Sequence, residues 1–299
     1  MKNLSHLKAI FLALFVTFLW STSFILIKWG LTEIPPLTYA GLRYTLAFLC
    51  LLPFTFKNKN IVVIKSLSKK DWYKLISYGF LFITLTQGTM FIGLLLLPAV
   101  TVSLWLNFTP LIVAIMGIFF LREYPTFLQW GGAMLFIVGI LTYFIPISLS
   151  ESKGFGLLIM TLGVLANSSS SVLGRDINRS GKLNPLVVTV ISMGFGSIVL
   201  LTAGIIIQGL PPISTQNIIY LIWLAVLNTA VAFIIWNYTL RTLTAMESSI
   251  INGTMLIQIA LLAWIFLGEG ISFKEIIGMS IAAIGALLVQ LRVRRRIEQ

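Results

Sequence analysis

Polar side chains interrupt several long apolar runs of this sequence, and their chemistry suits reversible binding. Most are amides, and single charged residues such as Arg43 and Glu247 occur among them. In a membrane interior a polar side chain must contact protein or water, so these residues are candidates for lining a solute pathway. The chain has one histidine, His6, one cysteine, Cys50, and no His-Glu-x-x-His motif. We therefore expect no enzyme, cofactor or metal site, but hydrogen bonds and ion pairs with a solute.

Helical spacing groups the polar residues on shared faces. Thr17, Ser21, Phe24 and Lys28 recur at i, i+4, i+7 and i+11, which is one face of a helix. Polar stripes on six apolar runs predict a common cavity, where deep tryptophans could stack on an apolar or aromatic solute. The residues predicted to bind the solute are Trp20, Arg43, Gln87, Asn107, Asn167, Ser170, Trp236, Asn237, Asn252 and Gln258.

Several of these residues have a structural alternative. Ser170 could permit close helix packing, and the amides could hydrogen-bond between helices. Arg43 could contact a solute carboxylate or hold its helix against neighbouring carbonyls. Glu247 is the carboxylate that we nominate for proton coupling, although the nearby Arg241 could pair with it. Lys28 lies at a helix end, where it is a gate residue or a snorkelling anchor.

The elements that must position these residues are membrane-spanning helices. The chain has 299 residues, 58% of them hydrophobic and 10% charged, which excludes a soluble enzyme, a disordered protein and a secreted disulfide scaffold. A bilayer core requires about 20 apolar residues in a helix. The ten predicted spans cover 8–31, 35–56, 72–97, 98–121, 127–147, 154–175, 184–208, 216–240, 244–267 and 273–291.

Positive charges orient these spans. Nearly all Lys and Arg residues of the connections fall on the side of the N-terminus, and only Lys153 and Lys274 fall on the other. Cytoplasmic loops retain positive charge, so both termini are predicted to be cytoplasmic. The basic tail 292–299 is then a juxtamembrane anchor, and the net charge of +12 reflects topology and not nucleic-acid binding.

The sequence repeats itself with inverted topology. Residues 97–141 align without a gap with residues 243–287, and Glu123 and Glu269 occupy equivalent turns, where we expect them to hold loop geometry. Thr126 and Gln129 form a capping-box pattern after the first turn. Repeats at 8–147 and 154–291 would each contain five helices, so the second enters the membrane in the opposite orientation. Secondary transporters use this arrangement.

Several motifs strengthen this interpretation. Trp20-Ser21-Thr22-Ser23-Phe24 is followed by Lys28, Pro35 and Pro36 precede Ala40-Gly41-Leu42-Arg43-Tyr44, and Gly132, Gly139, Gly278 and Gly285 follow the repeated glutamates. With the ten spans and the repeat, the chain resembles EamA-type ten-helix permeases of the drug/metabolite transporter superfamily. The resemblance implies export or permeation of amino acids, related metabolites or toxic compounds through a central cavity.

The sequence therefore predicts an all-α integral membrane protein of the cell membrane, functioning as a secondary transporter by alternating access. No phosphate-binding loop occurs, so its energy would come from a gradient. A facilitative channel-like carrier or a lipid flippase is the alternative. The expected partners are a small-molecule solute, the lipid bilayer and, as an open alternative, a second copy in a homodimer.

Overall fold

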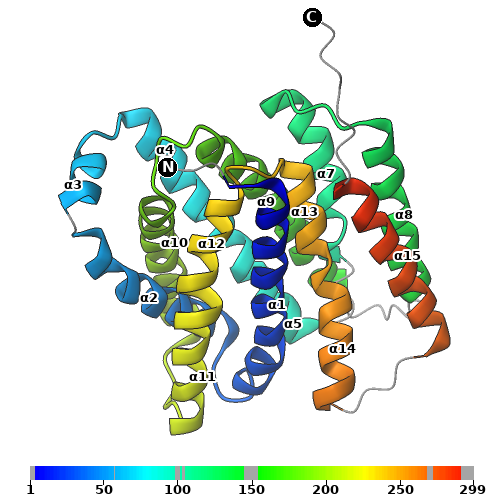
Figure 1. Cartoon of the computed structure of the whole chain (residues 1–299). Helices are drawn as coiled ribbons and strands as arrows, with labels where there is room; N and C mark the ends of the chain where they lie inside the picture. Colours follow the sequence, from blue (N-terminus) through cyan, green and yellow to red (C-terminus); the bar gives the residue numbers. More distant parts are fainter. Residues whose placement is uncertain are drawn as a thin grey trace, which may run out of the picture.

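A computed structural model describes residues 4–56, 58–97, 102, 105–144, 154–267 and 272–290, and the regular structure of these residues is helical (Figure 1). The basic tail and Glu269 lie outside them. The elements are α1 (His6–Gly30), α2 (Pro36–Thr55), α3 (Asn58–Lys65), α4 (Lys69–Gly79), η1 (Phe80–Gln87), α5 (Gly88–Leu96), α7 (Thr109–Met116), η2 (Gly117–Leu121), α8 (Phe127–Phe144), α9 (Gly154–Arg179), α10 (Pro185–Gln208), α11 (Thr215–Ala225), η4 (Val226–Val231), α12 (Ala232–Thr239), α13 (Ala245–Gly253), α14 (Met255–Leu267) and α15 (Phe273–Gln290). The η segments are π-helical.

Seven helical stretches of the described chain are long and apolar enough to cross a membrane, by length and composition. Three shorter apolar stretches, Thr109–Leu121, Phe127–Thr142 and Ile276–Val289, overlap the remaining predicted spans. Ten crossings therefore stay a prediction, whereas a multi-pass helical membrane protein is the observed class. The start of α1 and the end of α15 lie at the same end of the bundle (Figure 1).

Local capping explains where several helices begin. The predicted box at Thr126 is confirmed: Gln129 Oε1 accepts from the Thr126 N–H at 2.9 Å, and Thr126 Oγ1 accepts from the Gln129 N–H at 3.3 Å. These contacts satisfy amides that have no partner inside the helix.

The connection between the second and third predicted spans differs from expectation, because it contains α3. There Asn60 Nδ2 donates to Phe54 O at 3.0 Å.

Two pairs of helices pack at glycines. α8 packs along α15 at one edge of the bundle, and α2 packs along α10 elsewhere (Figure 1). A Cβ on Gly139 would lie 2.3 Å from the backbone nitrogen of Ala282, and one on Gly41 would lie 2.4 Å from Leu201 Cα. Backbones at this distance leave no room for a side chain. Each pair joins a helix from residues 4–144 to one from residues 154–290.

We expect Gly139→Ala to destabilise the protein, because the added methyl group meets backbone atoms of α15 that cannot rotate away. Overpacking of this kind costs about 1–3 kcal/mol. The midpoint of thermal unfolding in detergent micelles measures the effect. Gly131→Ala is the matched control, since a Cβ there meets no heavy atom within 4 Å. Equal midpoints for the two variants would contradict the backbone contact.

Candidate functional site

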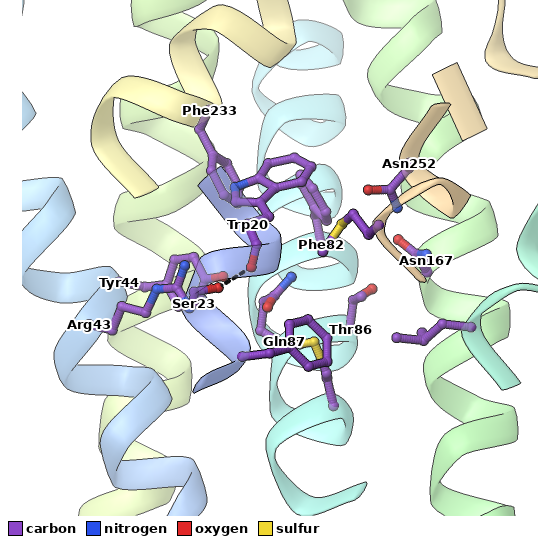
Figure 2. Close-up of a pocket in the computed structure, with 14 residues that line it drawn as sticks. Trp20, Ser23, Arg43, Tyr44, Phe82, Thr86, Gln87, Asn167, Phe233 and Asn252 are labelled. Carbon is purple, nitrogen blue, oxygen red and sulfur yellow. Dashed lines mark hydrogen bonds between the residues drawn. The ribbon is translucent and has the colours of Figure 1, made fainter. Parts of the chain in front are cut away.

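A cavity lies at the centre of the bundle and is lined by helices from both halves of the sequence. It contains about 520 Å³ of unfilled space, part of it open to the surroundings. Its walls come from α1, α2, η1, α5, α9, α12, α13 and α14, together with Leu106. Figure 2 shows Arg43 and Tyr44 on one side, Asn167 and Asn252 on the other, and Trp20 and Phe82 between them.

Two further pockets adjoin this cavity. The pocket toward the end of the bundle where α1 begins contains about 300 Å³ of unfilled space and is lined by Trp20, Ser170 and Trp236, among others. The other contains about 380 Å³ and is lined by Asn107 and its neighbours. Asn167 and Asn252 line all three spaces, so they lie at the junction.

The structure brings eight of the ten predicted binding residues to these three spaces. Trp20, Arg43, Gln87, Asn107, Asn167, Ser170, Trp236 and Asn252 line at least one of them. Asn237 and Gln258 are absent from the lining of these described pockets. Asn237 Nδ2 donates to Thr189 Oγ1 at 3.0 Å, and Gln258 Nε2 donates to Thr17 Oγ1 at 3.1 Å. The structure thus places these two amides in helix packing.

Aromatic rings form much of the wall, and three of them were not predicted. Phe233 contacts Trp20, Tyr44 and Phe82, with ring centroids 5.4, 5.8 and 5.0 Å apart. Trp236 packs 5.1 Å from Trp20. Phenylalanines in an apolar run carry no sequence signal that separates a cavity wall from a lipid-facing surface. Tyr44 had one signal, since it directly follows Arg43.

Arg43 is 2% exposed and makes the structural contacts that were considered for it. Its Nε donates to Thr229 Oγ1 at 2.8 Å and its Nη2 donates to Asn228 O at 3.4 Å, which joins α2 to η4. The guanidinium also lies 5.3 Å from the Tyr44 ring centroid and lines the cavity. Its remaining N–H groups have no hydrogen-bond partner within the described chain. No acidic side chain occurs among the residues described as lining the three spaces.

Irregular helices surround the cavity. The π-helical segments η1 and η4 begin 146 residues apart, at Phe80 and Val226, the same offset at which the sequence matches itself. η4 supplies the carbonyl and hydroxyl that bind Arg43, and η1 supplies Phe82 and Gln87 to the wall. π-helical turns are frequently found at functional sites. Their positions were not predicted, because one additional residue barely alters hydrophobic periodicity.

Two helices are also interrupted beside the cavity. α7 begins after Asn107 and Phe108, and α13 is separated from α14 by Thr254. The two interruptions meet, since a Cβ on Gly253 would lie 2.9 Å from Asn107 Oδ1. Discontinuous membrane helices expose backbone polar groups, which proteins tolerate where they line a cavity.

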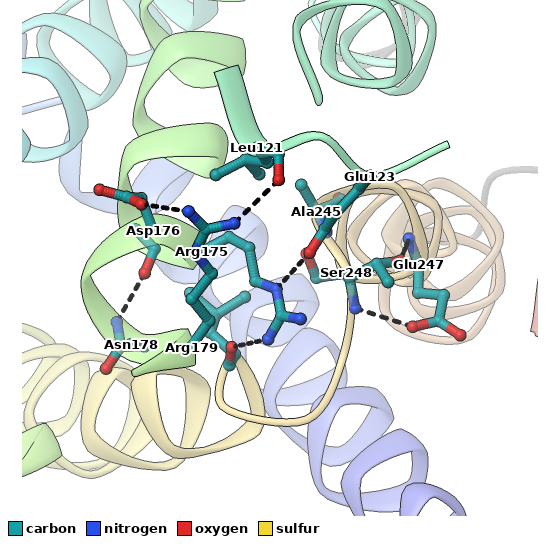
Figure 3. A network of polar contacts seen from close by, with 12 residues as sticks. Leu121, Glu123, Arg175, Asp176, Asn178, Arg179, Ala245, Glu247 and Ser248 are labelled. Carbon is teal, nitrogen blue, oxygen red and sulfur yellow. Dashed lines mark hydrogen bonds and ion pairs between the residues drawn. The ribbon is translucent and has the colours of Figure 1, made fainter. Parts of the chain in front are cut away.

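A polar network joins the two halves at the end of the bundle where α1 begins (Figure 3). Arg175 Nε donates to Glu123 Oε1 at 2.8 Å, and Glu123 Oε2 accepts from the Ala245 N–H at 3.0 Å. Arg179 donates to Leu121 O at 2.9 Å. Asn167 precedes Arg175 on α9 by eight residues, about 12 Å along the axis. The network therefore lies nearer to this end of the bundle than the cavity residue Asn167 does.

The predicted turn and coupling glutamates have additional contacts. Glu123 follows Arg122, whose left-handed φ of 56° ends the preceding helix, and its side chain bridges to Arg175. Glu247 is fully buried in the first turn of α13, where it accepts from the Thr244 N–H at 2.7 Å and lies 2.9 Å from His6 Nε2. His6 is thus an observed side-chain neighbour of Glu247, and Arg241 donates to Leu183 O.

At the opposite end, the two halves are joined by contacts of the loop after α1. Lys28 is exposed in the last turn of α1. Glu33 Oε2 accepts from Asn217 Nδ2 at 2.6 Å and from the Ser214 N–H at 3.4 Å. Hydrogen bonds from Asn217 and Ser214 hold the pKa of Glu33 below its ordinary value. The described residues contain no group of three His, Cys, Asp or Glu that could hold a metal.

Comparison with known proteins gives one family. Residues 7–145 and 154–291 each match the EamA-like transporter family. An "Uncharacterized transporter" of Archaeoglobus fulgidus is 25% identical over 97% of this chain and 99% of its own length. The "S-adenosylmethionine/S-adenosylhomocysteine transporter" of Chlamydia trachomatis is 22% identical over 94% of this chain and 88% of its own. A solved structure titled "Crystal structure of protein" has a similar fold, with a TM-score of 0.76, 17% identity and coverage of 95% and 96%.

Proposed function

Because the chain belongs to the EamA-like transporter family of the drug/metabolite transporter superfamily, we propose that it is a secondary transporter of small amphipathic metabolites, such as amino acids. The observation that carries this proposal is the central cavity, whose walls combine aromatic rings, amides and one buried guanidinium from both halves. Aromatic faces suit the apolar part of a solute, and the polar groups fix its orientation. We propose the cell membrane as its location and export as its direction.

We propose ten crossings in two inverted repeats, 8–147 and 154–291, with both termini in the cytoplasm. The excess of positive residues on that side supports the orientation. The equal offset of η1 and η4 supports the repeat, because related halves would preserve a local irregularity at equivalent positions. The interruptions at Phe108 and Thr254 have the same offset.

Alternating access gives the polar network a mechanical role. With this orientation, Glu123, Arg175 and Arg179 lie at the cytoplasmic end, and their contacts keep the halves together there. The described conformation is then closed to the cytoplasm. An exporter must break this network to load solute and form it again before release on the other side.

In the loaded state, Arg43 binds an anionic group of the solute. A guanidinium buried away from acidic side chains is electrostatically costly in a membrane, and a bound carboxylate would offset that cost. The N–H groups of Arg43 that remain after its contacts with η4 can form charge-assisted hydrogen bonds. Trp20, Phe82 and Phe233 pack against the apolar part of the same solute.

Uptake into proteoliposomes by the full chain tests this function. The panel contains labelled amino acids together with S-adenosylmethionine and S-adenosylhomocysteine, because of the relative named for these solutes. We expect saturable flux of at least one compound, which protein-free liposomes lack. Accumulation that follows an imposed pH gradient would assign coupling to protons and make the His6–Glu247 pair the next target. Lipid scrambling without solute flux would overturn the proposal in favour of a flippase.

A further inference from the structure

Helix α13, which supplies Asn252 to the wall opposite Arg43, carries two buried side-chain oxygens that have no hydrogen-bond partner among the described residues. Ser249 is 4% exposed, and its Oγ has no hydrogen-bond partner among the described residues; the same is true of Asn252 Oδ1. Both atoms are buried. A buried acceptor without a partner loses its hydrogen bonds to water and gains nothing in exchange. Such oxygens are therefore able to accept hydrogen bonds from a donor group of a bound ligand.

These two residues form one binding surface. They are three residues apart on α13, which places them on the same face of the helix. Both line the pocket at the helix interruptions, together with Asn107, Thr109 and Gly253. All of these groups are uncharged, and hydroxyl and amide oxygens in such a pocket favour a cationic or neutral donor over an anion.

Arg43 and Asn252 lie on opposite sides of the cavity, and Ser249 lies in the adjoining pocket that Asn252 also lines. Figure 2 shows Arg43 on one side and Asn252 on the other, with the Asn252 side-chain oxygen directed toward the interior. The rings of Trp20 and Phe82 lie between the two sides. Asn252 lines the main cavity as well as the pocket at the interruptions, so one solute can reach both walls.

We propose that the cavity binds a solute with an anionic group at one end and an ammonium or similar donor at the other, separated by a planar apolar body. The anion pairs with Arg43, the body lies between Trp20 and Phe82, and the donor bonds to Ser249 Oγ and Asn252 Oδ1. An α-amino acid carries both groups on one carbon atom and cannot satisfy both walls. This inference rests on the proposed function, in which the cavity is the transport site.

Four small aromatic compounds separate the contributions of the two walls. 4-(Aminomethyl)benzoate has its ammonium and carboxylate at opposite ends of a ring. 4-Methylbenzoate lacks the ammonium, 4-methylbenzylamine lacks the carboxylate, and phenylalanine carries both at one end. We expect isothermal titration of the purified full chain in micelles to show 4-(aminomethyl)benzoate binding about tenfold more tightly than each of the other three.

Variants assign that difference to the proposed atoms. Ser249→Ala and Asn252→Ala should each weaken binding of 4-(aminomethyl)benzoate several-fold and leave that of 4-methylbenzoate unchanged. The second ligand controls for folding within the same variant. Ser280→Ala is the matched control for Ser249→Ala, because Ser280 is exposed on α15 and donates to Ile276 O.

Three results would overturn the inference. One is tighter binding of phenylalanine than of 4-(aminomethyl)benzoate, another is an equal loss for both benzoates in the α13 variants, and the third is no binding of 4-(aminomethyl)benzoate. If the proteoliposome panel shows flux and any of these three results occurs, the solute with charged groups at opposite ends is ruled out. The proposed transport function then still stands. Binding in the expected pattern, without proteoliposome flux of 4-(aminomethyl)benzoate or of any compound in the panel, would instead contradict the transport function.

Discussion

Replacing Arg43 with glutamine is expected to lower the kcat/KM for transport of an anionic solute about a hundredfold. The change removes the charge and the planar fork that pairs with a carboxylate, and a charge-assisted pair out of water is worth about 2–3 kcal/mol. Flux of a neutral amide of the same solute should change little. Initial uptake rates of the two solutes into proteoliposomes give the comparison.

Thr229→Val controls for the structural role of Arg43. It removes the hydroxyl that Arg43 Nε contacts at 2.8 Å and leaves the guanidinium charge in place. We expect this variant to have a lower unfolding midpoint than the native chain and to retain discrimination between the acid and its amide. If Arg43→Gln also retained that discrimination, Arg43 would only hold α2 against η4.

Breaking the cytoplasmic network is expected to shift the protein toward a state open to the cytoplasm. Glu123→Gln loses the charged contact with Arg175, two side chains that are 19% and 13% exposed. A partly buried pair of this kind is worth about 1–2 kcal/mol, so the population of the open state should rise about tenfold. Transport should fall, because the closed state must form again in every cycle.

Cysteine labelling measures this shift directly. Ser171→Cys, in a Cys50→Ser background, places a thiol in the pocket behind the network. A membrane-impermeant reagent added on the cytoplasmic side should label it about tenfold faster in the Glu123→Gln variant. Asp71→Asn is the control, since that acid binds Ser68 within its own capping box. Equal labelling rates in both variants would show that the network does not close this end.

The sequence predicted the helical segments well, because hydropathy and capping are local properties. The Thr126–Gln129 box is an example in which two side chains determine a helix start wherever the helix then packs. α3 was missed because its eight residues carry too many polar groups to be distinguished from a charged loop. All ten predicted apolar segments contain helix in the described chain. Three of these helices are shorter than the seven that are long enough to span a membrane.

The site was only partly predictable, because spacing identifies a face but not the neighbour that it meets. Asn252 and Gln258 both lie on the ninth predicted span, yet one lines the cavity and the other bonds Thr17. Likewise, Phe82 and Phe233 look like ordinary apolar residues until the packing of η1 against α12 brings them together. The bridge between Glu123 and Arg175 joins residues that are 52 positions apart.

The glycine contacts constrain how the bundle can deform. α8 with α15 and α2 with α10 are two seams that each join the halves, and neither has side chains at its closest points that could rearrange. If the helices between these two seams moved, the packing of α8 on α15 and of α2 on α10 would remain intact, and the two seams would act as a fixed frame. A transport cycle confined to the helices between the seams would change little of the membrane area that the protein occupies. The lateral pressure of the lipids would then do almost no work during the cycle.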